Sequence, residues 1–278
     1  MNAEIVGLVF GFVVLPAICI GLERFWPQLK SYRTLRAGFG SDVIWYFTQT
    51  FVSRIVAPWI VFFLVLPVFL VGGLSLDNYW EGFGPLSRLP FAAQVAIALV
   101  VGDFLSYCQH RLFHTKAAWK IHAVHHSSEK VDWLSSVRFH PFNEIGAQVV
   151  VVAPLIAAGV SPMAFVVLVP FTSTYAVLLH ANVNWSFGPL RHVVASPTFH
   201  RWHHTQAAEA QNKNFGALFP VWDVLFGTFY HPVDRVPENF GVEDAVPEGF
   251  AAQLLYPLRS QVENSGASKS GEQPVGRA

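Results

Sequence analysis

Nine of the twelve histidines of this chain fall into a few short motifs between residues 110 and 204. The motifs are HRLFH, HAVHH and HRWHH, and one isolated histidine, His180, precedes the third of them. Neutral imidazole is the commonest protein ligand for transition metals. A lone histidine in an apolar chain is more often a hydrogen-bonded core residue. Three motifs within 95 residues instead indicate a metal centre.

The spacing within the motifs predicts how many metal ions this centre holds. Residues three or four apart share one face of a helix, so His110 and His114 point the same way. In each HxxHH motif the first histidine reaches the same region as the fourth and fifth residues. The adjacent pair diverges by about 100° around a helix, so its two rings can serve two different ions. The pattern therefore indicates a two-metal site built almost wholly from nitrogen.

The composition excludes several classes of protein. The chain has 278 residues, of which 53% are hydrophobic and 13% are charged, whereas soluble domains carry about 25% charged residues. The formal net charge is zero, so the charge balance does not indicate a nucleic-acid partner. Cys19 and Cys108 lie far apart in apolar stretches, which argues against a disulfide framework and a thiolate metal site. We expect an integral membrane protein.

Long uncharged runs predict where the chain crosses the membrane. We expect the first two crossings at Ile5–Leu22 and Ile55–Leu76, and a third crossing that starts near Pro90 and ends in the first histidine motif. Residues 42–54 either lie in the membrane interface or extend the second helix. Residues 145–190 carry no Asp, Glu, Lys or Arg, which is enough for two crossings around the turn Gly159-Val-Ser-Pro162. This hairpin, spanning or re-entrant, returns His180 to the side of the first motifs. The predicted fold is all-α, with about five transmembrane helices and a cytoplasmic histidine-rich helical cap.

An acidic residue at membrane depth adds a candidate for chemistry. Asp103, Tyr107, His110 and His114 are spaced four, three and four, so all fall on one helical face. Asp103 could hydrogen-bond a metal-bound imidazole, or it could form a hydrogen bond between helices. The two interpretations stay open at this point.

The remaining segments set the domain limits and the orientation. In this interpretation residues 1–258 form one membrane-embedded domain and residues 259–278 are a disordered tail. Within the domain, residues 211–230 form either a cap over the site or an interfacial scaffold. Basic residues gather on the histidine side, which predicts that this side is cytoplasmic and that the N-terminus is outside. A positive rim there could dock an acidic ferredoxin or cytochrome, or anchor the protein to the membrane surface. It consists of Arg111, Lys116, Lys120 and Arg201.

These motifs resemble the fatty acid hydroxylase / sterol desaturase superfamily over roughly residues 90–235. The histidine motifs and HANVNW carry the resemblance, and so do Asp103-x-x-x-Tyr107-x-x-His110-Arg111, Arg138-x-His140-Pro141-x-x-Glu144 and Trp222-Asp-x-Leu-Phe-Gly-Thr. The resemblance implies a di-iron membrane enzyme that uses O₂ on lipid-like substrates, here in a bacterial inner membrane. It implies as metal ligands His110, His114, His122, His125, His126, His180, His200, His203 and His204.

One position departs from this pattern. Many relatives have a second histidine four residues after the one that matches His180, and here Asn184 occupies that place. Asn184 could bind metal directly, bind it through a water, or leave a position open. His140 is not a usual ligand position and is interpreted, with Glu144, Asp103 and Tyr107, as a partner of the ligand side chains or a structural residue. His192 and His231 lie outside any motif.

The chemistry of the site favours an oxidoreductase. Iron activates O₂, whereas zinc does not change its oxidation state, although zinc could replace iron in purified protein. The chain has no ExxH motif of the soluble di-iron bundles and no flavin, nicotinamide or haem-binding signature, so a separate electron donor is implied. Hydroxylation and desaturation of a fatty acyl, sterol or hopanoid substrate both remain open, as does the oligomeric state. The alternatives are a zinc-dependent membrane hydrolase and a non-catalytic haem or metal carrier.

Overall fold

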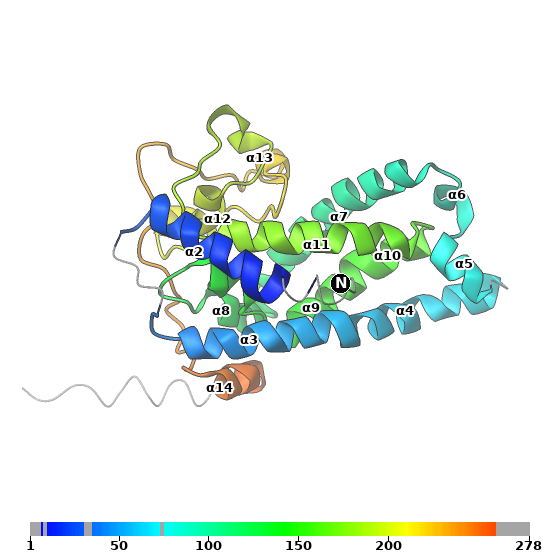
Figure 1. Ribbon diagram of the computed structural model, residues 1–278, viewed down its shortest axis with the longest axis horizontal. Helices are drawn as coiled ribbons and strands as arrows, with labels where there is room; N and C mark the ends of the chain where they lie inside the picture. The colour runs from blue at the N-terminus through cyan, green and yellow to red at the C-terminus, as the bar shows by residue number, and fades with distance from the viewer. Residues whose placement is uncertain (1–6, 8–9, 31–34, 73–74, 260–278) are drawn as a thin grey trace, which may run out of the picture.

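The computed structural model describes residues 7, 10–30, 35–72 and 75–259, and these residues form helices joined by loops, with two isolated β-bridges (Figure 1). The α-helices are α2 (Leu15–Phe25), α3 (Phe39–Phe51), α4 (Ala57–Gly72), α5 (Leu76–Glu81), α6 (Gly84–Ser87), α7 (Phe91–Phe113), α8 (Trp119–His126), α9 (Pro141–Ala147), α10 (Ala153–Ala157), α11 (Pro162–His180), α12 (Pro197–His203), α13 (Val221–Leu225) and α14 (Phe250–Leu255). Short π- and 3₁₀-helical segments are η1 (Phe10–Val14), η2 (Val52–Val56), η3 (Trp133–Val137), η4 (Gln148–Val152), η5 (Gly188–His192), η6 (Ala208–Ala210) and η7 (Tyr256–Leu258). The expected helical fold is confirmed for this part of the chain.

Three helices are long and apolar enough to cross a membrane. They are Phe39–Gly72, Phe91–Phe113 and Pro162–His180. The first has 34 residues, because residues 42–54 extend the second predicted crossing instead of lying apart from it. A further apolar helix, Pro141–Ala157, is shorter. Part of the predicted crossing at Ile5–Leu22 and nearly all of the predicted tail lie outside the described residues, so the count of five crossings stays a prediction.

Proline explains where the helices widen into π-turns. The three π-helical segments end at Val14, Val56 and Val152, and in each case a proline follows two residues later: Pro16, Pro58 and Pro154. Proline lacks an N–H and its ring clashes with the carbonyl four residues earlier in an α-helix. A wider turn just before the ring relieves that clash without ending the helix.

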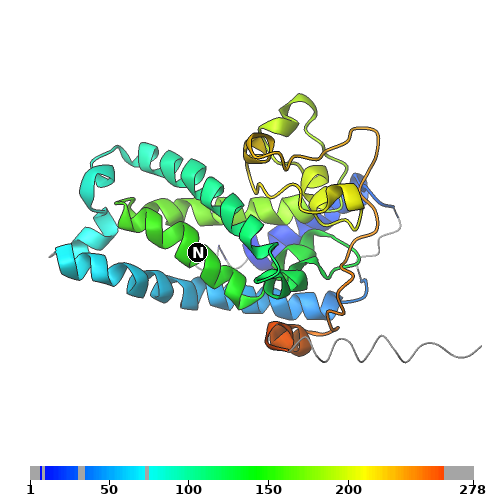
Figure 2. The ribbon, with the colours of Figure 1, turned by 180° about the vertical axis from the view of Figure 1, so that it is seen from behind.

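The hairpin predicted after the second histidine motif is present. Gly159 has φ +104°, and a Cβ there would lie 1.9 Å from the carbonyl oxygen of Phe83, so only glycine fits this turn. Ser161 caps α11 and donates from its hydroxyl to the carbonyl of Trp80 at 2.7 Å. The turn thus lies against α5 and the link between α5 and α6 at the far end of the bundle, and α11 returns His180 to the opposite end (Figures 1 and 2).

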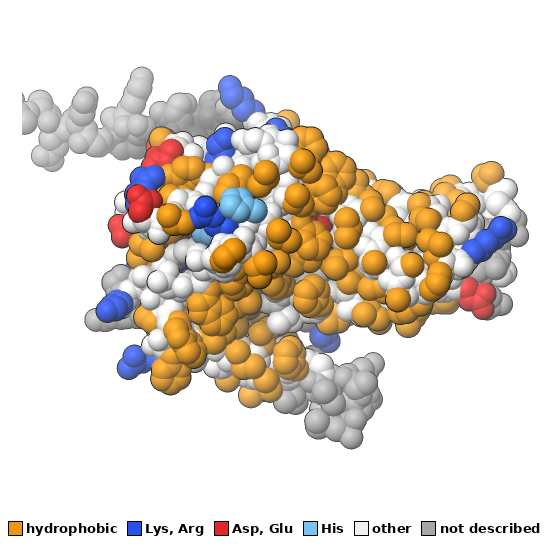
Figure 3. All heavy atoms as spheres, turned by 90° about the horizontal axis from the view of Figure 1, so that it is seen from above, with side chains coloured by type: hydrophobic (Ala, Val, Ile, Leu, Met, Phe, Trp, Pro, Cys, Tyr) orange, Lys and Arg blue, Asp and Glu red, His pale blue; other side chains and the backbone are white. Residues whose placement is uncertain are grey.

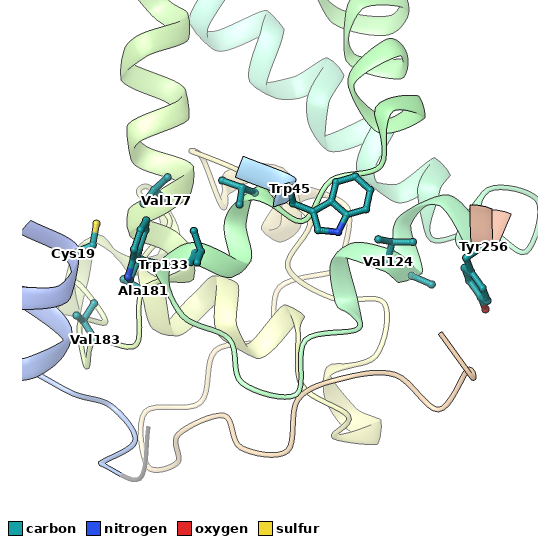
Figure 4. Close-up of a cluster of buried hydrophobic side chains, with 11 residues drawn as sticks. Cys19, Trp45, Val124, Trp133, Val177, Ala181, Val183 and Tyr256 are labelled. Atoms are coloured by element: carbon teal, nitrogen blue, oxygen red, sulfur yellow. The ribbon is translucent and has the colours of Figure 1, made fainter. Parts of the chain in front are cut away.

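A buried apolar cluster fixes the helices at the histidine-bearing end, here called the head. Figure 4 shows Cys19 of α2, Trp45 of α3, Val124 of α8 and Val177 of α11 around it. Trp133 of η3 completes the contact between these elements. Val124 is fully buried and directly precedes His125, so the packing of this cluster sets where the second histidine motif lies.

A buried ion network fastens the start of α3 to the segment after the second motif. Arg36 contacts Asp42 at 2.8 Å and Asp132 at 2.6 Å, and Arg138 contacts Asp42 at 2.6 Å. Removing one partner of such a pair leaves a buried charge unpaired, which is strongly destabilising. Arg36 and Arg138 therefore lie in the interior and do not belong to the basic surface of the head.

The positive rim predicted from the sequence is only partly correct. Arg201 is fully buried, donates to the carbonyl of Val131, and lies 4.7 Å over the ring of Phe240. Arg111 and Lys116 are exposed and Lys120 is half-buried. The sequence could not place Arg201, because its partner lies 70 residues away in the chain.

Candidate metal centre

The nine motif histidines meet at the ends of four helices. His110 lies in the last turn of α7, His114 directly follows that helix, and His180 is the last residue of α11. The remaining six lie on α8 and at the end of α12. Ser196 caps α12 by accepting a hydrogen bond from the backbone N–H of Phe199, which fixes where the third motif begins. The ends of α7, α11 and α12 that carry these histidines, together with α8, therefore all lie in the head (Figure 1).

The histidines divide into two groups. One holds His110, His114, His122, His126 and His203, and the other holds His125, His180, His200 and His204. Within each group the nitrogens that could bind an ion lie within 4.8 Å of one another.

This division follows helix periodicity. The pairs four residues apart, His110 with His114, His122 with His126 and His200 with His204, each stay in one group. The adjacent pairs, by contrast, are split between the two groups, as the sequence analysis predicted for a two-metal site. The groups touch where the rings of His126 and His204 stack with their centroids 4.3 Å apart.

The nitrogen positions fit metal coordination. In the four-histidine group, Nε2 of His180 lies 3.1 Å from Nε2 of both His125 and His200, and His200 and His204 are also 3.1 Å apart. In the other group, Nε2 of His110 and of His122 are 3.0 Å apart. Nitrogens that bind one ion at about 2.0–2.1 Å are separated by roughly 2.9–3.4 Å at neighbouring positions. The Nε2 atoms thus converge as ligands of one ion would.

Several of these buried rings have an Nε2 atom without a hydrogen-bond partner among the described residues. Among the described residues, Nε2 of His114, His126 and His203 has no hydrogen-bond partner, and an unsatisfied buried polar atom is costly. Burial, followed by the neighbouring imidazoles, holds the pKa of His122, His126 and His203 well below the ordinary value of 6.5. Neutral imidazole is the form that binds metal.

Backbone carbonyls fix the orientation of three rings. Nδ1 of His110 donates to the carbonyl of Phe215 at 2.9 Å, and Nδ1 of His203 donates to that of Lys213 at 2.7 Å. Nδ1 of His180 donates to the carbonyl of Ala176 at 2.7 Å. A ring that carries its proton on Nδ1 presents the lone pair of Nε2 to an ion, which is the arrangement typical of metal-ligating histidine.

Residues 211–230 lie over the five-histidine group. The ring of Phe215 is 5.0 Å from that of His114 and 5.4 Å from that of His110. Buried Asp223 accepts hydrogen bonds from the backbone N–H groups of Phe215 and Gly216, both at 2.8 Å. Of the two interpretations of this segment, the cap over the site is the one that the contacts match.

The acidic residue of α7 binds this cap rather than an imidazole. Asp103 accepts from the N–H of Leu218 at 2.9 Å and of Phe219 at 3.1 Å, and from the indole N–H of Trp222 at 2.9 Å. Tyr107 is buried beside it, with its hydroxyl 2.9 Å from that of Thr228. Of the two interpretations of Asp103, the contacts match a hydrogen bond between α7 and another segment, here the cap, and not one to a ligand ring.

Three other predicted site residues lie away from the two groups. His140 caps α9, and its Nε2 donates to the carbonyl of Leu254. Glu144 accepts from the side chains of Gln49 at 2.8 Å and Gln148 at 2.7 Å. Asn184 is exposed and its backbone N–H donates to the carbonyl of Trp26, so the structure gives no support to Asn184 as a ligand.

Two asparagines that the sequence analysis did not single out for the site hold its parts together. The side chain of buried Asn143 lies 3.0 Å from Nδ1 of His122. Asn214 has φ +59° and donates from its side chain to the carbonyls of Phe199 and Tyr230. Because Asn214 lies between Lys213 and Phe215, this turn directs both of their carbonyls at ligand rings. An asparagine in a turn carries no sequence signal that distinguishes this role.

Comparisons with known proteins agree with this geometry. Residues 95–228 match the fatty acid hydroxylase family. The chain is 33% identical to the ornithine lipid hydroxylase OlsE of Rhizobium tropici over 182 residues, which are 65% of this chain and 55% of that protein. It is 29% identical to the alkylglycerol monooxygenase of Danio rerio over 197 residues, 69% of this chain and 44% of that protein. A very-long-chain aldehyde decarbonylase of rice, GL1-5, is 30% identical over 170 residues, 56% and 26% of the two chains.

The matched segments thus span about half of these relatives or less. No solved structure is significantly similar to the chain. The family match covers the residues that carry all nine clustered histidines and residues 211–228 of the cap that closes over them. This part of the chain therefore matches the fatty acid hydroxylase family.

Proposed function

We propose that the protein is a membrane-bound, O₂-dependent di-iron enzyme that hydroxylates a lipid-like substrate. The observation that carries this proposal is the division of nine imidazoles into groups of five and four that touch through His126 and His204. Similarity to an ornithine lipid hydroxylase and to alkylglycerol monooxygenases favours hydroxylation over desaturation.

Each part of the site has a role in this proposal. Iron, when bound by the two groups, supplies the activation of O₂. The carbonyls of Phe215, Lys213 and Ala176 keep the proton of their histidine partners on Nδ1, so that Nε2 faces the ions. The ring of Phe215 covers His110 and His114 and excludes water from that side. The apolar helices bring the site to a depth that a lipid chain can reach.

The reaction balances with a separate electron carrier. One oxygen atom of O₂ is inserted into a C–H bond of the lipid to form an alcohol, and the other is reduced to water. A one-electron carrier of the ferredoxin or cytochrome class supplies the two electrons, and two protons come from solvent. We propose the exposed side of the head as the place where the carrier binds, with Arg111 and Lys116 as basic contacts.

We further propose that the head lies on the cytoplasmic side of a bacterial inner membrane. The exposed basic residues Arg24, Lys30, Lys116 and Lys130 all lie on or near the head, as the positive-inside rule requires. Reporter fusions at Asp77 and Ser161 should both give the external signal. A cytoplasmic signal at Asp77 would contradict this placement.

The activity is tested with purified protein in lipid nanodiscs. Protein loaded with iron should convert extracted membrane lipids to products with one added oxygen, only when O₂ and a reducing system are both present. With ¹⁸O₂ the label should appear in the lipid, whereas a desaturase would send it to water. His126→Ala should abolish the product, and exposed His192→Ala, outside both groups, should retain it. Turnover without O₂ and reductant would instead support a zinc hydrolase.

A further inference from the structure

The short helix α13 is turned with its polar side inward. Asp223 is fully buried, and its carboxylate accepts hydrogen bonds from Phe215, Gly216 and the hydroxyl of Thr228. On the outer side, Val224 is 47% exposed, Leu225 is 66% exposed, and Phe226 just after the helix is 51% exposed. A helix on an aqueous surface buries its apolar side chains, so this arrangement indicates an apolar environment outside α13.

A second element presents apolar side chains in the same way. Leu190 of η5 is 59% exposed and Val193 just after it is 54% exposed. This segment is joined to the α13 segment, because the N–H of Ala195 donates to the carbonyl of Leu218 at 2.9 Å. The rings of His192 and Phe229 also pack with their centroids 4.8 Å apart. We call Leu190, Val193, Val224, Leu225 and Phe226 the apolar collar.

The collar lies beside an apolar helix rather than beyond its end. Asp103 of α7 binds the backbone just before α13, and Phe104 packs on Trp222 with centroids 5.0 Å apart. About 20 residues cross the hydrocarbon core, so a crossing that begins at Phe91 reaches to about His110. Asp103 and Phe104 therefore lie roughly two thirds of the way along that crossing. In Figure 3, hydrophobic side chains gather along the bundle and also on the adjoining part of the head.

We propose that the apolar collar inserts into the boundary between headgroups and acyl chains of the lipid bilayer. This inference rests on the proposed membrane placement and adds a second region of lipid contact to it. Half-buried Arg191 lies on η5 next to Leu190, where it can bind a lipid phosphate, as basic residues do beside interfacial helices. If the collar bound a protein partner instead of lipid, its apolar surface would not need to adjoin the apolar surface of the bundle.

The collar also connects the bilayer to the metal centre. α13 contacts lipid on its outer side and holds the backbone of Phe215 through Asp223 on its inner side, and the carbonyl of Phe215 holds His110. A lipid that lies against α13 is thus one layer of protein from the five-histidine group. The collar marks the side of the head from which a lipid substrate approaches.

Depth-dependent fluorescence quenching tests this proposal. Starting from Cys108→Ala, which leaves only buried Cys19, single cysteines are introduced by Leu225→Cys, Val166→Cys and Glu243→Cys and labelled with an environment-sensitive nitrobenzoxadiazole dye. Val166 is an exposed residue of α11 and serves as the membrane control, and exposed Glu243 is the aqueous control. The protein is placed in phosphatidylcholine–phosphatidylglycerol vesicles with spin-labelled lipid quenchers, or with aqueous iodide.

The dye at position 225 should lose fluorescence to a quencher near the headgroup and resist iodide, whereas the dye at 243 should be quenched by iodide alone. If lipid quenches the dye at 166 but iodide quenches the dye at 225, the collar does not insert into the bilayer. The proposed membrane placement of the helices would still stand in that case. Absence of lipid quenching at 166 as well would refute the placement itself. Protection of position 225 from both quenchers would indicate a second copy of the chain and would also overturn the proposal. Val193→Cys repeats the measurement on the other element if Leu225→Cys does not fold.

Discussion

The side-chain amide of Asn143 lies 3.0 Å from Nδ1 of His122, and both residues are buried. Nε2 of the same ring is 3.0 Å from Nε2 of His110, inside the five-histidine group. A ring that gives its Nε2 lone pair to an ion carries its proton on Nδ1 and needs an acceptor there. Oδ1 of Asn143 has no other hydrogen-bond partner among the described residues, and a half-turn of the amide brings it to this position.

Replacement of Asn143 should therefore weaken metal binding without unfolding the protein. We expect Asn143→Leu to lower metal affinity about 10–100-fold, because the His122 ring loses the acceptor that orients it. Asn143→Asp, which keeps an acceptor oxygen, should bind metal close to the wild-type affinity. Competition with a chelator, read as metal retained per folded chain, measures the difference. Equal retention by the leucine and aspartate variants would show that Asn143 does not position the ring.

The proposed ligand set makes a sharper prediction about the adjacent pairs. His125→Ala and His126→Ala remove neighbours in the sequence that belong to different groups, so each should deplete a different metal position and abolish activity. Asn184→Ala should leave metal content near that of the wild type, because Asn184 is exposed and outside both groups. Metal content and activity are measured on the same preparation. Full metal occupancy in His125→Ala would refute the assignment.

The division of the histidines could be predicted from the sequence because it depends on helix periodicity alone. Rings four residues apart stay together and adjacent rings separate, whatever the rest of the fold does. The return of His180 to the head was equally predictable, because an uncharged run with one turn in its middle must double back. Gly159 and Ser161 then form that turn as expected.

The partners of the polar residues could not be predicted in this way. Asp103 binds backbone groups 115 and 116 residues further along the chain, and Arg201 donates to a carbonyl 70 residues earlier. Such contacts depend on how the helices pack, which periodicity does not determine. The spacing of Asp103 therefore left a bond to a ring and a bond between helices both open, and the packing of the cap decided between them.

Asp103 should contribute to the stability of the protein through the cap. Asp103→Leu leaves three buried donors without an acceptor, so we expect a loss of at least about 2 kcal/mol of unfolding free energy. Asp103→Asn retains one acceptor oxygen and should lose less. Thermal unfolding in detergent compares both with Glu243→Leu, a change at an exposed residue. A melting temperature unchanged in Asp103→Leu would contradict the role of this contact.

The buried histidines predict that stability falls in mild acid. Burial keeps the pKa of His114, His122 and His126 below 6.5 in the folded protein, while the same side chains titrate near 6.5 when unfolded. Below pH 6.5 the unfolded chain therefore binds more protons than the folded chain, and the free energy of unfolding decreases. We expect metal-free protein to melt at progressively lower temperature as the pH falls from 7 to 5. A constant melting temperature over this range would show that these rings are not buried as neutral groups.

The count of metal ions per folded chain tests the account most directly. Protein reconstituted with iron under anaerobic conditions and freed of excess metal should contain two ions per chain by elemental analysis, one for each histidine group. Zinc in place of iron would leave this count unchanged, because the same nitrogens bind both metals. One ion or none in protein that is fully folded by circular dichroism would contradict the two-metal centre.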